Sequence, residues 1–179
     1  MKLDKIREIA NELVGQLRPY CDRIEIAGSI RRKKPDCGDV EIVCIPRKVS
    51  IMGDLFPGHD CKVRDPEFIR TVNSWPAMKG DAQGKYMQRF MRDVQVDIFT
   101  ADKDNWGLIL GIRTGPAEYS HKVLAEGWCA KGYHSKDGYL RKGLTLVRVP
   151  EEADLFKLIG LPWVEPNERG PAKSGPRAS

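Results

Sequence analysis

The chain has 179 residues, of which 41% are hydrophobic and 31% are charged, a composition typical of a soluble globular domain or of two small lobes. No apolar run approaches the ~20 residues of a membrane helix, and the charged N-terminus is unlike a signal peptide. The net charge of +5 favours polyanionic partners but excludes few functions by itself. Five cysteines without a Cys-x-x-Cys pair predict free thiols in a reducing compartment. We therefore expect a cytoplasmic protein, of a bacterium or a viral factory, that is not secreted.

The first part of the chain predicts a helix followed by two strands. Apolar residues recur at helical spacing over residues 3–17, and Pro19 ends this helix. Two short segments rich in β-branched residues then predict strands over 23–28 and 39–45. The second segment is almost entirely apolar, which indicates a strand in the middle of a sheet.

The segment that follows is harder to interpret, because its pattern is irregular from residue 50 to residue 84. Repeated Pro and Gly mark turns there, around one short helix expected over residues 67–74. A pair of strands is predicted next, and its second member, over residues 94–100, alternates between apolar and polar positions. These strands complete a mixed sheet with flanking helices.

The remaining sequence predicts a smaller, mostly helical lobe. We expect helices over residues 106–112 and 117–130, separated by a Thr-Gly-Pro turn, and then a hairpin-like segment and a last short helix. The final residues are rich in Pro, Gly and Ser, which is typical of disorder. The predicted α+β chain therefore divides into a lobe over residues 1–101, a lobe over 102–168 and a disordered tail over 169–179.

Two acids interrupt the predicted central strand. Side chains alternate between the faces of a strand, so Asp39 and Glu41 project to the same side, about 7 Å apart by the ~3.3 Å rise per residue. Carboxylates at that spacing repel each other in a dry site, and a divalent cation relieves the repulsion. Asp97 in the later strand is a third candidate, and three carboxylates on neighbouring strands suit two-metal phosphoryl transfer. The alternative is that these acids pair with nearby Lys or Arg.

A basic turn precedes the acidic strand in the segment "AGSIRRKK". The chain leaves a strand through Gly28, and a helical turn that begins near Ser29 would direct free N–H groups toward an anion. Arg32 falls on the same side of that turn, and Gly38 lets the backbone approach a ligand closely. This order predicts a triphosphate held between the turn and the metal ions. The alternative is a solvated basic loop.

With these features in this order, the sequence resembles the nucleotidyltransferase superfamily, and within it the family X DNA polymerases of the polymerase beta group. The resemblance is carried by "GSIRR", by an Asp-x-Glu ten residues after Ser29, by "VQVDIFTA", by "RTGP" and by "LIGLPWVEPNER". It extends over about residues 3–169. It implies a catalytic palm lobe with a mixed sheet, followed by a thumb-like lobe. It also implies that Asp39, Glu41 and Asp97 are catalytic and bind two Mg²⁺ ions, with Mn²⁺ as a substitute.

The resemblance further implies a DNA-directed DNA polymerase that acts in short-gap filling or repair. Such an enzyme transfers a nucleoside monophosphate from a dNTP to a DNA primer 3′-hydroxyl and releases pyrophosphate. DNA and nucleoside triphosphates would be its partners, no membrane would be involved, and it would act as a monomer in a minimal palm-plus-thumb form. The positions matching the family's nucleotide-binding residues are Gly28, Ser29, Arg32, Gly38, Thr114 and Gly115.

The chain also departs from the family pattern. Glu41 replaces the usual Asp, Gln95 replaces an Arg, and Ile112 and Arg113 stand where the family has an aromatic pair. Two other functions therefore stay open. One is template-independent nucleotide transfer to RNA, a protein or a small molecule. The other is a catalytically inactive module that binds nucleic acid.

Overall fold

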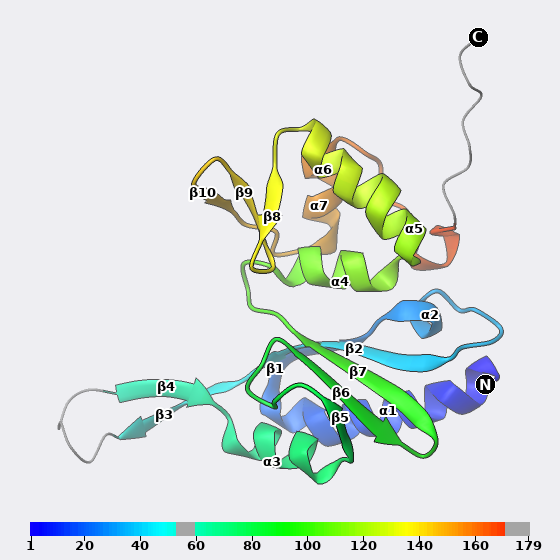
Figure 1. Ribbon diagram of the computed structural model, residues 1–179, viewed down its shortest axis with the longest axis vertical. Coiled ribbons are helices and arrows are strands. Elements are labelled where there is room, and N and C mark those ends of the chain that lie inside the picture. Colours follow the sequence, from blue (N-terminus) through cyan, green and yellow to red (C-terminus); the bar gives the residue numbers. More distant parts are fainter. Residues whose placement is uncertain (53–59, 171–179) are drawn as a thin grey trace.

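The computed structural model describes residues 1–52 and 60–170 and has an α+β fold around a mixed five-stranded sheet (Figure 1). The parallel pair β2–β7 lies at its centre, and the other neighbouring strands are antiparallel. The strands in spatial order are β1 (Cys21–Ile26), β2 (Asp39–Pro46), β7 (Val94–Thr100), β6 (Tyr86–Met91) and β5 (Ala77–Lys79). The two strands that carry the candidate acids are therefore neighbours.

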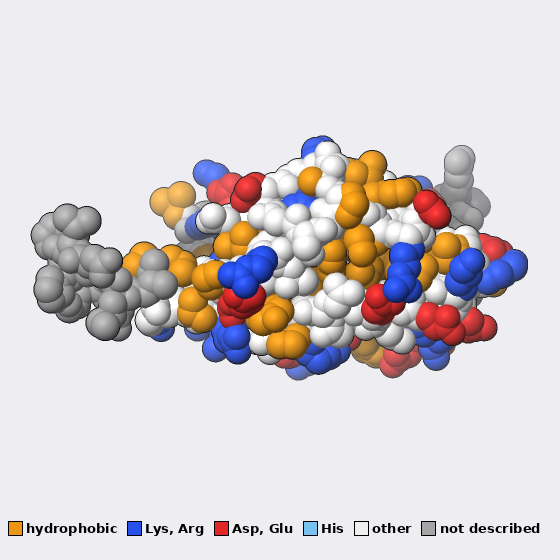
Figure 2. Space-filling view, turned by 90° about the horizontal axis from the view of Figure 1, so that it is seen from below, with side chains coloured by type: hydrophobic (Ala, Val, Ile, Leu, Met, Phe, Trp, Pro, Cys, Tyr) orange, Lys and Arg blue, Asp and Glu red, His pale blue; other side chains and the backbone are white. Residues whose placement is uncertain are grey.

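One face of this sheet is covered by α1 (Leu3–Leu17) and α3 (Pro66–Ser74), as Figure 1 shows. The predicted first helix is confirmed, and its apolar stripe packs against the side chains of β2 that point away from the acids. On α3, the Asp65 side chain accepts a hydrogen bond from the backbone N–H of Glu67 at 2.9 Å and so caps the helix. Figure 2 views the molecule from this side and shows cations and acids intermixed among apolar side chains.

The segment expected to be irregular contains strands that the sequence did not indicate. β3 (Lys48–Met52) and β4 (Asp60–Arg64) form an antiparallel hairpin, and β5 is the exposed edge of the main sheet. The expectation of an irregular segment was wrong here. Hairpin and edge strands are defined by backbone pairing more than by buried side chains, so they leave a weak hydrophobic pattern.

The residues after 105 form a second, smaller assembly with its own apolar core, which contains Leu108, Trp128 and Phe156. The predicted helix at 117–130 consists of α5 (Ala117–Tyr119), the π-helical turn η2 (Ser120–Ala125) and α6 (Glu126–Ala130). The predicted hairpin gains a third strand. The remaining elements of this assembly are α4 (Trp106–Thr114), β8 (His134–Lys136), β9 (Tyr139–Lys142), β10 (Thr145–Val147), α7 (Glu152–Ile159) and the short turn η3 (Pro166–Glu168).

Helix α4 joins the two assemblies. It lies over the face of the sheet opposite α1, where Trp106 and Leu110 pack against Val43 and Phe99 (Figure 1). Beyond this apolar contact, the C-terminal end of α4 borders a cavity that Asp39 and Glu41 of β2 also line.

A buried ion network also connects the two assemblies. Glu152, only 4% exposed, pairs with Arg31 at 2.8 Å and with Arg169. Arg169 also donates to the Val164 carbonyl at 3.0 Å and contacts the ring of Phe156. Although the sequence placed Arg169 at the start of a disordered tail, it is 1% exposed. Residues 171–179 of that predicted tail lie outside the described residues.

Two expectations from composition concern the whole chain. Among the described residues, no helix is both long enough and apolar enough to cross a bilayer. The five cysteines are free thiols: Cys37 and Cys44 are buried, whereas Cys61 and Cys129 are exposed.

Candidate active site

The pairing of β2 with β7 brings the three candidate carboxylates to one face of the sheet. Glu41 lies opposite Asp97, and Asp39 lies opposite Gln95. Side chains at paired positions of neighbouring strands point to the same side, and residues two apart share a face. The intervening Val40 points the other way, into the core beneath α1. The acids thus face the side of α2 (Gly28–Arg31) and α4.

Asp97 is held by its neighbours on the sheet. It is 7% exposed and accepts hydrogen bonds from the Tyr86 hydroxyl at 2.8 Å, from the Gln88 amide at 3.1 Å and from the Gln95 amide at 2.9 Å. Burial, and then the adjacent Asp97 carboxylate, raise the pKa of Tyr86 to about 12, so the phenol stays a donor at neutral pH. These contacts fix the orientation of the carboxylate.

Sequence reasoning did not identify Tyr86 and Gln88 as site residues. Their spacing of two along a predicted strand puts them on one face, and this alternation was the available signal. It became informative only once β6 was known to lie beside β7, with Gln88 opposite Asp97.

The electrostatics of the acids favour a bound cation. Burial, followed by the charge of Asp39, raises the pKa of Glu41 to about 7, while Arg113 and Arg32 act in the opposite direction. Burial and the charge of Asp97 likewise raise the pKa of Asp39. Like charges are therefore held together in a partly dry site, and their hard oxygen donors suit Mg²⁺. Within the described residues, no three acidic, His or Cys side chains lie close enough together to enclose an ion, so water and phosphate oxygens would have to supply the other ligands of a bound Mg²⁺.

The raised pKa of Glu41 predicts how the stability of the metal-free protein changes with pH. The folded state holds this proton up to about pH 7, whereas the ordinary value is 4.5, so stability falls as pH rises between these values. We expect a loss on the order of 2–3 kcal/mol from Glu41 in the presence of EDTA. Urea unfolding at pH 5 and pH 8 measures it, and Glu41→Gln serves as the comparison. An equal pH dependence in the variant and the wild type would contradict the assignment.

The turn α2 approaches the acids closely because it begins with glycine. Gly28 has a φ of 61°, and a Cβ there would lie 2.0 Å from Oε2 of Glu41. In the next position, the Ser29 hydroxyl is buried and has no hydrogen-bond partner among the described residues, and the same is true of the Arg32 Nε. Buried polar groups are normally paired, so these two atoms indicate a missing partner.

A cavity of about 360 Å³ lies between the turn, the acids and the end of α4. Its walls contain the candidate residues Ser29, Arg32, Asp39, Glu41 and Gly115, together with Ile112, Arg113, Pro116, Ala117 and Ser120. Residues that are far apart in the sequence thus converge on one space that is large enough for several phosphate groups.

Thr114 and Gly38, two further candidate nucleotide-binding residues, are not among the residues that line this cavity. Thr114 is fully buried, its hydroxyl accepts a hydrogen bond from Arg31 at 2.6 Å, and its carbonyl accepts one from Arg32 at 2.6 Å. Its polar atoms are therefore already engaged in holding α2 against α4. A Cβ added at Gly38 would meet nothing within 4 Å, so this glycine borders open space.

The site thus combines acids on adjacent strands of an α+β sheet with a Gly-Ser turn beside them. No family model matches the chain. The chain is a distant relative of DNA polymerase lambda from Arabidopsis thaliana, a family X polymerase, with 25% identity over 169 residues. The aligned region covers 82% of this chain but only 31% of the relative. This similarity supports a relationship to nucleotidyltransferases of the polymerase beta type.

Proposed function

We propose that the protein is a metal-dependent DNA polymerase of the family X type, in which residues 1–101 form the palm and 102–168 a thumb-like lobe. The observation that carries this proposal is the shared cavity. Asp39 and Glu41 line it together with a buried Ser29 hydroxyl that has no hydrogen-bond partner in the described part of the chain, and Asp97 lies beside Glu41 in the parallel ladder. The distant polymerase relative supports the same reaction class.

Each group has a role in the proposed transfer. Asp39, Glu41 and Asp97 would hold two Mg²⁺ or Mn²⁺ ions, which supply Lewis acidity at the attacking hydroxyl and at the departing pyrophosphate. Ser29 and Arg32 would bind the outer phosphates, since charge-assisted hydrogen bonds to phosphate are strong. Asp97, fixed by three hydrogen bonds, would accept the proton of the primer 3′-hydroxyl as its oxygen attacks the α-phosphate.

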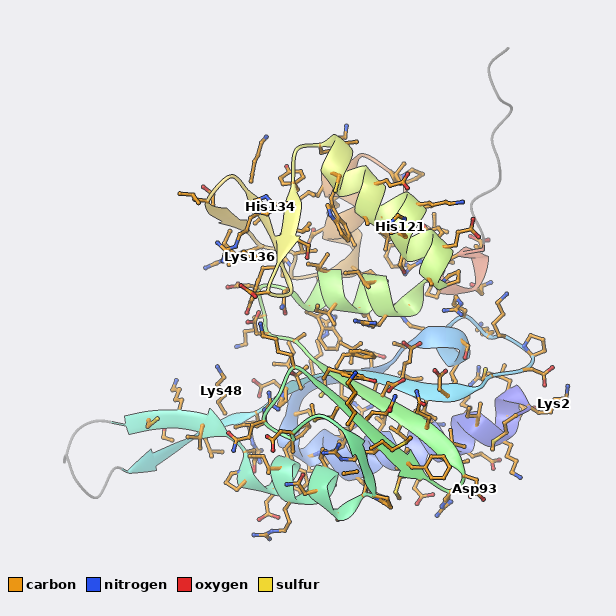
Figure 3. The ribbon with its side chains drawn as sticks, in the orientation of Figure 1. Lys2, Lys48, Asp93, His121, His134 and Lys136 are labelled. Carbon is orange, nitrogen blue, oxygen red and sulfur yellow. The ribbon has the colours of Figure 1, made fainter. Side chains whose placement is uncertain are left out.

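DNA is the proposed acceptor, and a protein that binds it needs Lys or Arg side chains that contact the phosphates of the DNA backbone. Lys136 on β8 and Lys48 on β3 both lie at the left of the view in Figure 3. Lys131, Arg141 and Lys142 adjoin Lys136 in the sequence around β8 and β9. Phosphate contacts of this kind position a duplex without reading its sequence, and they make binding dependent on salt.

A gap-filling assay tests the proposed function. Labelled DNA with a one-nucleotide gap is incubated with Mg²⁺ or Mn²⁺ and each dNTP or rNTP separately, and Asp39→Asn serves as the inactive control. Extension by mainly the complementary dNTP, absent in the control, is the expected result. Extension by every nucleotide would replace the polymerase with a template-independent transferase. Binding of gapped DNA without any extension would leave only a nucleic-acid-binding module.

A further inference from the structure

Arg113 places a cation in the site cavity at a position where the resemblance to family X polymerases implies an aromatic side chain. It lies in the last turn of α4 and lines the cavity together with Ser29, Arg32 and Glu41. Its side chain is exposed, and no hydrogen bond or ion pair within the described part of the chain involves it. The donors of its guanidinium are thus available to a ligand.

The guanidinium is nevertheless held in a defined place. It lies over the ring of Phe99, 3.9 Å from the centroid, and Phe99 is stacked on Tyr86 with the ring centroids 5.1 Å apart and an interplanar angle of 20°. Tyr86 in turn donates to Asp97. A cation over an aromatic face is attracted by the ring and keeps its N–H edge free for hydrogen bonding. The two stacked rings therefore link the Arg113 guanidinium to the Asp97 carboxylate.

The position of Arg113 gives the cavity two cationic walls. Arg32 comes from the end of α2 and Arg113 from the end of α4, and the carboxylates of Asp39 and Glu41 lie in the same space. The charge of Arg113 lowers the pKa of Glu41, although the two side chains form no ion pair within 4.0 Å. A planar guanidinium that is not paired with a carboxylate is well suited to bind two oxygens of a phosphate.

We propose that Arg113 is a substrate-binding residue of this cavity and that its guanidinium contacts a phosphate oxygen of the bound nucleoside triphosphate. This inference rests on the proposed function, because it takes the cavity to be the nucleotide site. It extends that function because Arg113, on α4, would bind phosphate in addition to Arg32 at the end of α2.

Equilibrium binding tests the proposal without turnover. The dissociation constants of dATP and of inorganic tripolyphosphate are measured with Ca²⁺ for the wild type, Arg113→Ala, Arg113→Lys and the matched control Arg70→Ala. Arg70 is an exposed arginine on α3 that pairs with Glu67. We expect Arg113→Ala to weaken both ligands about tenfold, as for one lost charge-assisted hydrogen bond, with partial recovery in Arg113→Lys and no change in Arg70→Ala.

Several outcomes would overturn the assignment. Affinities in Arg113→Ala within twofold of the wild type would do so, and so would an equal loss in Arg70→Ala. If Arg113→Ala does not fold, Arg113→Gln retains the bulk of the side chain, and unchanged tripolyphosphate affinity in that variant would reject the contact. A protein that binds tripolyphosphate through Arg113 but transfers no nucleotide would refute the polymerase while leaving this anion contact intact. Transfer with an unaltered KM for dNTP in Arg113→Ala would refute the contact alone.

Discussion

Replacing Asp97 with asparagine is expected to lower the rate of nucleotide transfer about 10²–10⁴-fold, the range for loss of a positioned proton acceptor. Asparagine keeps the size of the side chain but removes the charge that would bind a cation and receive the proton. The rate is measured as single-turnover extension of gapped DNA at saturating dNTP and Mg²⁺. Because Asp97 is the most buried of the three acids and is held by Tyr86, Gln88 and Gln95, its geometry depends little on the ligand.

The control for this experiment separates chemistry from folding. Tyr86→Phe removes one hydrogen bond to Asp97 and retains the ring that stacks on Phe99, so a smaller loss of rate is expected, with only the modest decrease in thermal midpoint of one lost hydrogen bond. If Asp97→Asn extends DNA within threefold of the wild-type rate, Asp97 has no part in the chemistry, and the proposed site is wrong.

Replacing Glu152 with glutamine is expected to lower the free energy of unfolding by about 3–5 kcal/mol, the range for breaking a buried ion pair. Glu152 is the shared partner of Arg31 and Arg169, and the substitution leaves two largely enclosed guanidinium groups without their counter-charge. Arg31 also holds the Thr114 hydroxyl, so the attachment of α2 to α4 should weaken as well. Urea unfolding at pH 7 gives the free energy.

An exposed pair provides the matched comparison. Glu12 and Arg92 are joined at 2.8 Å, but both side chains are well exposed, so Glu12→Gln should change stability by less than about 1 kcal/mol. Equal effects of Glu12→Gln and Glu152→Gln would mean that the buried network does not hold the helical assembly to the sheet.

The acids and the Gly-Ser turn could be predicted from the sequence because their signal is local. Alternation along one strand puts Asp39 and Glu41 on the same face, and the parallel register of β2 and β7 confirms that Asp97 lies beside Glu41. The helix at 3–17 was equally predictable, because its apolar stripe is continuous.

The features that could not be predicted depend on contacts between distant residues. The hydroxyl of Thr114 is occupied by Arg31, which lies 83 residues earlier in the chain, and no local pattern indicates this pairing. Arg169 follows a Pro-rich segment and precedes a polar one, so its surroundings in the sequence indicate an exposed residue. It is buried because it pairs with the buried carboxylate of Glu152. The sequence shows Arg113 only as a departure from a motif, because its position over the ring of Phe99, in the cavity that Asp39 and Glu41 line, depends on the packing of α4 against β7.

Mn²⁺ binding, followed by electron paramagnetic resonance, is the most direct test of the claim that these carboxylates form a metal-dependent nucleotide site. The titration uses the intact chain with a non-hydrolysable dNTP analogue and gapped DNA. We predict two Mn²⁺ ions per chain in the wild type, and a large loss of binding in Asp39→Asn and Glu41→Gln. Binding that is absent from the wild type, or that is unchanged in both variants, would contradict the account.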